Sequence, residues 1–295
     1  MKKFISFILL LLFYTTGFSQ TVSLSQKIEQ IISNKKANIG VAVLGFESGD
    51  TLIINKNNHY PMQSVFKFHL ALAVLHQVDE GKMKLYQKIL VSKKDFAVET
   101  WSPIRDKYPN GGVYLPLSEI LHYTVAESDN TGCDLLFRLM GGPKKVNRYI
   151  HSVGIKDVNI VANEAAMHKD DKVQYNNWTT SFAMVQLLEK FYSGKLFKKE
   201  TTDFLRKTME ETSTGPKRIK GLLPSGTIVA HKTGSSGTNK AGLTSATNDA
   251  GIITLPNGKH FVIAVFISDS YENNETNERI IAEISKATWD YFIGK

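Results

Sequence analysis

Cysteine is nearly absent from this chain, in which Cys133 is the only thiol. An intramolecular disulfide is therefore impossible, and the fold must rest on noncovalent packing. Cys133 lies in an apolar segment with no activating base beside it, so we expect a small core residue and not a nucleophile. The eight histidines also lack the His-Glu-x-x-His pattern and other metal-ligand spacings. We therefore predict no metal site and no cofactor.

Long apolar runs are missing after the start of the chain. The start combines the basic segment Met1–Lys3, the apolar run Phe4–Tyr14 and small residues ending at Ser19. This pattern predicts a signal peptide over residues 1–19, cleaved near Gln20, and a periplasmic or secreted product. The alternative is an uncleaved anchor, but the run is shorter than the about 20 residues that span a bilayer. No cysteine ends the run, so we expect neither a lipid anchor nor membrane association after cleavage.

Basic residues outnumber acidic residues without forming a cluster. The chain has 36 Lys and Arg against 28 Asp and Glu, a formal charge of +8. Removal of the signal takes away Lys2 and Lys3 and leaves 34 − 28 = +6. Because the basic residues are spread along the chain without interleaved aromatic residues, we expect no nucleic-acid partner. We expect a monomer that acts on a small molecule.

Strand-like and helical segments follow one another in an order that favours an α+β fold over alternating βαβ units. The first and last strands would share one antiparallel sheet in an α/β lobe, about residues 20–60 and 212–295. The middle, about 61–211, would form a helical lobe, and a cleft between lobes is a common place for a site. Residues 161–178 look irregular. The expected strands are 39–46, 51–55, 227–233, 250–255 and 261–268; the expected helices include 24–33, 66–79, 117–125, 133–140, 181–191, 202–210 and 277–292.

Ser64 and Lys67 form a Ser-x-x-Lys pattern at the start of an apolar helical run. Helix spacing places the two side chains one turn apart on the same face. A serine hydroxyl is a poor nucleophile until a base takes its proton, and a lysine amine with a lowered pKa can serve as that base. By itself, the pattern favours the alternative of a helix N-cap serine and a surface lysine.

Ser128, Asp129 and Asn130 lie between two expected helices. From such a loop, a second hydroxyl can relay a proton to a leaving nitrogen, and the amide of Asn130 can bind both Lys67 and a substrate amide. The alternative is a helix cap, since Ser, Asp and Asn all cap helices. Both interpretations can hold at once, with Asp129 as the cap.

Lys232, Thr233 and Gly234 end an expected strand. Lysine and threonine there can hold a carboxylate, and glycine lets a substrate backbone approach. The backbone N–H groups of Ser64 and Ser235 are candidates for an oxyanion hole, because such donors stabilise the charge that develops on an attacked carbonyl.

These three motifs, in this order, resemble those of class A β-lactamases and penicillin-binding proteins. Glu164, in Asn163-Glu164-Ala165-Ala166-Met167-His168, matches the omega-loop glutamate that activates the hydrolytic water of class A serine β-lactamases. The resemblance covers the mature chain. It implies a five-stranded antiparallel sheet with flanking helices and an all-α lobe, and β-lactam hydrolysis with Ser64, Lys67, Ser128 and Glu164 as catalytic residues. The alternatives are a penicillin-binding DD-peptidase and a non-hydrolysing β-lactam sensor domain, both of which lack this glutamate.

Several positions depart from the usual family pattern. His168 replaces an asparagine that helps to hold the water, and Ala162 and Asn177 replace an Arg–Asp ion pair that closes the loop. These departures resemble an extended-spectrum branch with a rearranged omega loop and a wide cleft. Arg218 resembles an alternative cation for substrate-carboxylate binding, and Trp101 resembles an aromatic wall at the cleft mouth. We therefore place His168, Arg218 and Trp101 among the substrate-binding residues.

Overall fold

The computed structural model describes residues 23–96 and 100–294 of the chain. The expected signal peptide, residues 1–19, lies outside these ranges. Within them, no helix is both long enough and apolar enough to cross a bilayer.

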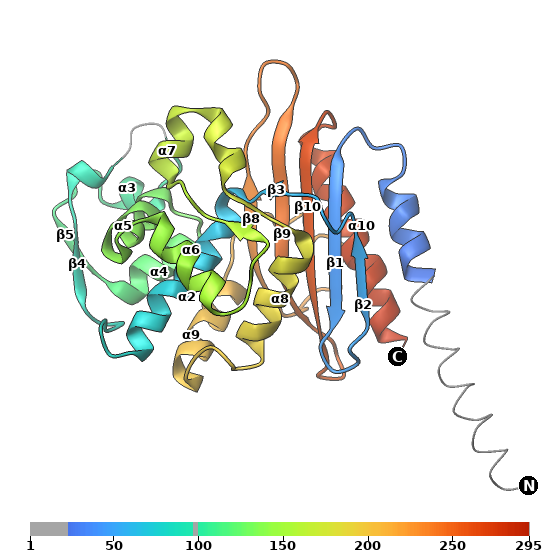
Figure 1. Ribbon diagram of the computed structural model, residues 1–295, viewed down its shortest axis with the longest axis horizontal. Helices are drawn as coiled ribbons and strands as arrows, with labels where there is room; N and C mark the ends of the chain where they lie inside the picture. The colour runs from blue at the N-terminus through green and yellow to red at the C-terminus, as the bar shows by residue number, and fades with distance from the viewer. Residues whose placement is uncertain (1–22, 97–99, 295) are drawn as a thin grey trace, which may run out of the picture.

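The two ends of the described chain share one five-stranded antiparallel sheet, as the sequence predicts. The strand order is β2-β1-β10-β9-β8, so strands from the start of the chain pair directly with strands from its end (Figure 1). The strand predicted over 250–255 begins at Thr244, and the strand predicted over 261–268 runs from His260 to Ser270. The strands are β1 Asn38–Gly45, β2 Thr51–Ile54, β8 Val229–Ser235, β9 Thr244–Thr254 and β10 His260–Ser270.

Helices cover both faces of this sheet (Figure 1). Alternate side chains of a strand point to opposite faces. In β10, Ile263 and Val265 pack with α10, Asn274–Ile293, and with a helix over residues 23–32. Ala264 and its alternating neighbours join the core on the side of α8, Ser181–Tyr192. Because both faces are covered, β1 and β10 are mostly apolar along their length.

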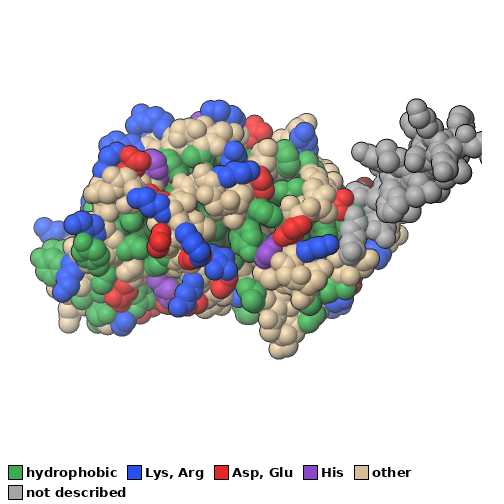
Figure 2. Space-filling model, turned by 90° about the horizontal axis from the view of Figure 1, so that it is seen from below, with side chains coloured by type: hydrophobic (Ala, Val, Ile, Leu, Met, Phe, Trp, Pro, Cys, Tyr) green, Lys and Arg blue, Asp and Glu red, His purple; other side chains and the backbone are tan. Residues whose placement is uncertain are grey.

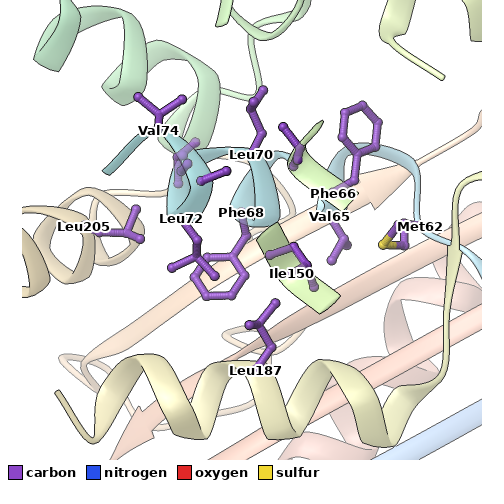
Figure 3. Close-up of a cluster of buried hydrophobic side chains, with 14 of the residues drawn as sticks. Met62, Val65, Phe66, Phe68, Leu70, Leu72, Val74, Ile150, Leu187 and Leu205 are labelled. Atoms are coloured by element: carbon purple, nitrogen blue, oxygen red, sulfur yellow. The ribbon is translucent and has the colours of Figure 1, made fainter. Parts of the chain in front are cut away.

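The helical part is built around α2, Phe66–Asp79, whose bounds match the prediction. Every residue from Phe66 to Leu75 is buried, so the helix is enclosed on all sides and does not present one apolar face. Figure 3 shows side chains of α2 meeting Leu187 of α8 and Leu205 of α9. The surrounding helices are α4 Leu117–Ala126, α5 Asn130–Met140, α6 Pro143–Ser152 and α9 Lys199–Glu210.

Several short elements were not predicted from the sequence. The expectation of an irregular segment over 161–178 is wrong in part, because α7 Glu164–Lys169 and the 3-10 helix η3 Asp171–Asn176 lie there. The others are β3 Tyr60–Pro61, β4 Lys88–Val91, β5 Val113–Pro116, β6 Val158–Asn159, β7 Trp178–Thr179, α3 Pro103–Lys107, and the 3-10 helices η1 Gln63–Val65 and η2 Lys93–Asp95.

On the face that Figure 2 shows, Lys and Arg side chains are scattered among acidic, polar and apolar ones. No single region of this face gathers the positive charge.

Candidate active site

A cavity of about 450 Å³ lies where β8 meets the helical part of the molecule. The three motifs, which are up to 170 positions apart, come together around it. Lys67 and Lys232 lie beneath its wall with fully buried side chains. The sequence-predicted site residues that line the cavity directly are Ser64, Trp101, Ser128, Asn130, Glu164, His168, Thr233, Gly234 and Ser235.

Ser64 sits in η1, the tight turn that leads into α2. Two neighbours fix this turn. The side-chain amide of Asn248, in β9, donates to the carbonyl oxygens of Pro61 at 2.8 Å and Met62 at 3.2 Å. A Cβ on Gly234 would lie 2.4 Å from the Met62 carbonyl oxygen. The absence of a side chain on Gly234 thus lets β8 pack against the turn that carries Ser64, and the approach of a substrate backbone to Gly234 stays a prediction.

Lys67 Nζ stands at the centre of the polar groups. It lies 3.0 Å from Ser64 Oγ and 2.9 Å from Glu164 Oε1. It also donates to the Ser128 carbonyl oxygen at 2.7 Å and to Asn130 Oδ1 at 2.5 Å. One buried amine therefore touches the candidate nucleophile, the candidate water-activating carboxylate and the Ser128 loop.

Ser128 is held with φ +60, a left-handed conformation that non-glycine residues rarely adopt. Lys232 Nζ donates to Ser128 Oγ at 3.0 Å, and Lys67 Nζ lies 3.4 Å from the same oxygen. Burial lowers the pKa of Lys232 well below its usual range, and the charge on Lys67 lowers it further. The hydroxyl thus lies between two amines that can supply a proton.

Asp129 has the capping role that we considered for it. Its carboxylate accepts from the backbone N–H groups of Gly132 and Ile104, both at 2.7 Å, and from Ser102 Oγ at 3.0 Å. Burial raises its pKa, and these hydrogen bonds oppose that shift. Asp129 therefore joins the start of α5 to α3 and holds the loop that carries Ser128.

Arg218 reaches the cavity through Ser235. Its Nη2 donates to Ser235 Oγ at 2.7 Å, and its Nη1 donates to the carbonyl oxygens of Gly234 at 3.1 Å and Asn248 at 3.0 Å. Its Nε pairs with Glu278 of α10 at 3.3 Å, and the side chain is 6% exposed. The guanidinium therefore packs behind the cavity wall, and its role in carboxylate binding stays a prediction.

Glu164 is the first residue of α7, and two side chains hold the start of that helix. Asn163 accepts from the Ala166 N–H at 3.1 Å. Asp134 of α5 accepts from the N–H groups of Glu164 at 2.8 Å and Ala165 at 2.9 Å. Burial raises the pKa of Asp134 to about 6. Sequence reasoning missed Asp134, although its position four residues after Asn130 on one helix places both on the same face.

Asn177 closes the segment that carries Glu164. Its Oδ1 accepts from the N–H groups of Val161 at 2.8 Å and Ala162 at 2.9 Å, and its Nδ2 donates to the Ala162 carbonyl oxygen at 2.8 Å. The side chain is fully buried. The neutral amide of Asn177 therefore joins the two ends of the segment. It does so at the positions where the usual family pattern has an Arg–Asp ion pair.

Trp101 and His168 lie at the mouth of the cavity. Trp101 is 60% exposed, and its Nε1–H donates to the Glu127 carbonyl oxygen at 2.8 Å, which fixes the indole at the rim. His168 is exposed in the last turn of α7. Both side chains line the cavity.

Cys133 is fully buried in α5, and burial raises the pKa of its thiol well above the usual range, which agrees with the expected core role. Among the residues in the described ranges, no group of three or more His, Cys, Asp or Glu side chains is placed to hold a metal ion.

Comparison with known proteins identifies this arrangement. A model of the β-lactamase enzyme family matches residues 23–292. β-Lactamase VEB-1 from Pseudomonas aeruginosa is 48% identical over 99% of this chain and 99% of its own length. The solved structure of TLA-1 extended-spectrum β-lactamase is 57% identical, with a TM-score of 0.91 over 92% of this chain and 99% of that chain. A class A β-lactamase structure from Bacteroides cellulosilyticus is 42% identical, with a TM-score of 0.90 over 94% of this chain and 99% of that chain. The α+β fold expected from the sequence is confirmed, and the chain belongs to the β-lactamase enzyme family.

Proposed function

We propose that this protein is a secreted serine β-lactamase that hydrolyses penicillins and cephalosporins through an acyl-enzyme on Ser64. The observation that carries the proposal is the position of Lys67, whose amine contacts both Ser64 and Glu164. The groups needed to form an ester and to hydrolyse it therefore share one buried site. The relatives named above as β-lactamases support the same activity.

In acylation, Ser64 Oγ attacks the lactam carbonyl carbon and gives up its proton. Two bases are available: Lys67 directly, and Glu164 through a water molecule. The N–H groups of Ser64 and Ser235 stabilise the negative charge on the carbonyl oxygen. When the C–N bond breaks, the Ser128 hydroxyl gives its proton to the ring nitrogen, and Lys232 or Lys67 restores it.

In deacylation, Glu164 removes a proton from a water molecule that attacks the ester carbon. The carbonyl oxygen again carries the negative charge, and Ser64 leaves with a proton returned to it. Glu164 is 8% exposed and is held by the capped start of α7, so its carboxylate is poised at the acylated serine. This step separates a β-lactamase from a DD-peptidase or a sensor domain, whose acyl-enzymes persist.

The substrate carboxylate is placed beside Thr233 and Ser235, with Lys232 and Arg218 beneath them supplying positive charge. Asn130 meets the substrate amide, Gly234 continues the strand edge, and Trp101 and His168 border the entrance. We propose a division into an α/β lobe, about 20–60 and 212–295, and a helical lobe, about 61–211, with the substrate between them. An extended-spectrum activity agrees with the names of relatives such as the TLA-1 enzyme.

We further propose that residues 1–19 direct secretion to the periplasm and are removed, that the mature protein is a monomer without a membrane anchor or cofactor, and that it binds no nucleic acid. These points rest on the sequence pattern alone.

A time course with a chromogenic cephalosporin tests the proposed activity. Purified protein is expected to give many turnovers per molecule. A single stoichiometric burst would instead indicate a DD-peptidase or a sensor, and no reaction at all would exclude all three. Ser64→Ala serves as the control, because no other residue is placed to become acylated; its circular dichroism spectrum shows whether it is folded.

A further inference from the structure

Asp171 is a charged residue on the cavity wall that has no part in the proposed reaction. It is the first residue of η3, it is exposed, and it lines the cavity. The cap of η3 is supplied by its neighbour Asp170, whose Oδ1 accepts from the Lys172 N–H at 2.9 Å. Among the residues that the structure describes, the Asp171 carboxylate has no hydrogen bond and no ion pair. Its charge is therefore available to a bound molecule.

A buried amide fixes the backbone of Asp171. Gln174 Nε2 donates to the Asp171 carbonyl oxygen at 2.6 Å, and Gln174 Oε1 accepts from the side-chain amide of Gln63. Gln174 is 7% exposed, and Gln63 directly precedes the nucleophile Ser64. The backbone turn that carries Asp171 is thus tied through Gln174 and Gln63 to the turn that carries Ser64, so the Asp171 backbone is held beside the cavity.

The wall around Asp171 is otherwise mostly uncharged. Met167 and His168 of α7 and Gln63, Gln174 and Ser236 line the same cavity. Glu164 is paired with Lys67 at 2.9 Å, which offsets its charge. The basic side chains of this region lie on the opposite side: Lys232 belongs to β8, and Arg218 packs against Gly234 and Ser235 of the same strand.

The proposed reaction places a particular part of the substrate at this wall. The ring nitrogen must face Ser128, and the carbonyl oxygen must face the N–H groups of Ser64 and Ser235. The ring carboxylate occupies the side of Thr233. The remaining substituent, the acyl side chain, is left to extend toward α7 and η3, where Asp171 lies.

We propose that Asp171 selects β-lactams by the charge of their acyl side chain. It favours side chains that carry an ammonium group or other N–H donors, and it disfavours side chains that carry a carboxylate. This inference rests on the proposed function and names a substrate preference of the same site. Because Asp171 is exposed, solvent screens its charge, and the expected effect is modest.

Three penicillins with one nucleus and a similar phenylacetyl side chain provide the test. The three drugs differ at the side-chain carbon that is attached to the phenyl ring. This carbon carries only hydrogen in benzylpenicillin, an ammonium group in ampicillin and a carboxylate in carbenicillin. We measure kcat/KM for each and divide the last two values by the benzylpenicillin value, which cancels general effects on the reaction. In Asp171→Asn, we expect the ampicillin ratio to fall about threefold and the carbenicillin ratio to rise about threefold. In Asp171→Glu, which keeps the charge, both ratios should stay close to those of the parent.

Two controls separate local charge from other effects. Glu200→Gln removes the same charge from the exposed first turn of α9 and should leave both ratios unchanged. Raising the salt concentration should shrink the difference between the parent and Asp171→Asn, because salt screens exposed charges.

The outcomes also distinguish the two proposals. If the parent protein does not turn over benzylpenicillin, the proposed function itself fails. If it does, but Asp171→Asn leaves both ratios unchanged, or moves both in the same direction, the charge-selection inference is wrong while the proposed function stands.

Discussion

Lys67 Nζ has four oxygen atoms of four residues within 3.0 Å, but a lysine ammonium carries only three hydrogens. At most three of these four oxygens can therefore accept a hydrogen from Lys67 at one time, and Ser64 can donate to the amine only when Lys67 is neutral. The spacing of Ser64 and Lys67 was predictable, because helix geometry alone sets it. The contact with Glu164 depends on how α7 packs against α5, which no local pattern encodes.

The partners of the Arg218 side chain could not be predicted from the sequence. Its charge was predictable, but its partners lie on three other elements: Ser235 on β8, Asn248 on β9 and Glu278 on α10. Only the assembled fold brings the guanidinium to Ser235.

Arg218→Ala should therefore lower kcat/KM for carboxylate-bearing cephalosporins by about tenfold or more, since hydrogen bonds to charged groups are worth about 1.5–3 kcal/mol. It should also lower the melting temperature, because Glu278 loses its partner. Arg218→Lys should recover only part of the activity, since lysine lacks the planar fork that reaches several acceptors. Steady-state kinetics and thermal unfolding of the two variants measure these effects. Equal kcat/KM in all three proteins would show that Arg218 supports neither Ser235 nor the substrate.

At the scale of elements, the segment from α7 to η3 departs most from its predicted form. Its polar sequence suggested an irregular loop, yet each end and turn has a specific side-chain partner. Asp134 caps α7, Asp170 caps η3, and Asn177 joins the two ends of the segment. A related case is β9, which was predicted to begin at Ala250. Its polar start, Thr244–Asp249, is a strand because it pairs with β8 and β10. Tertiary pairing overrides weak strand propensity in that stretch.

Asn177→Ala should destabilise the folded protein, because it leaves the buried N–H of Ala162 and the part-buried N–H of Val161 without their acceptor. Each unsatisfied buried group costs about 1–3 kcal/mol. Asn177→Asp should be less damaging, since a carboxylate still accepts from both N–H groups, although it loses the bonds that the amide donates to the Ala162 carbonyl oxygen and, at 3.6 Å, to Met167 Sδ. The free energy of unfolding, measured with urea, orders the three proteins. If Asn177→Ala matched the parent to within about 0.5 kcal/mol, this amide would not be what closes the segment.

At the scale of the whole molecule, the sequence order of strands, helices and strands was enough to predict one antiparallel sheet built from both ends of the chain. The central helix α2 was predicted with its observed bounds, because its apolar run ends clearly before Gly81. What the sequence did not reveal is how completely this helix is enclosed. Because α2 is enclosed, the side chain of its residue His69 is fully buried. Burial lowers the pKa of His69 to about 4.

His69 should make the protein sensitive to acid. Its pKa is lower in the folded state than the unfolded value near 6.5, so its contribution to stability is fully present above about pH 6.5. That contribution is lost as the pH falls toward 4, since the unfolded chain then binds a proton that the folded protein resists. For a lowering of this size, the loss approaches about 3 kcal/mol.

His69→Leu isolates this effect. A change in packing shifts the free energy of unfolding by the same amount at every pH, whereas loss of the titrating group makes the difference between variant and parent depend on pH. We expect His69→Leu to gain stability relative to the parent between pH 6.5 and pH 4. A difference that stays constant over this range would show that His69 does not titrate as its burial implies.

The central claim is that Ser64 becomes acylated and that Glu164 drives the release of the acyl group. Intact-mass spectrometry of Glu164→Gln during reaction with a cephalosporin tests both halves in one measurement. Removal of a general base typically slows a step by about 10²–10⁴-fold. We therefore predict a covalent adduct that builds up within seconds to minutes, maps to Ser64 after proteolysis and persists, while the parent protein shows little adduct and many turnovers. A Glu164→Gln protein that turned over the drug at the parental rate, or an adduct on any residue other than Ser64, would contradict the account.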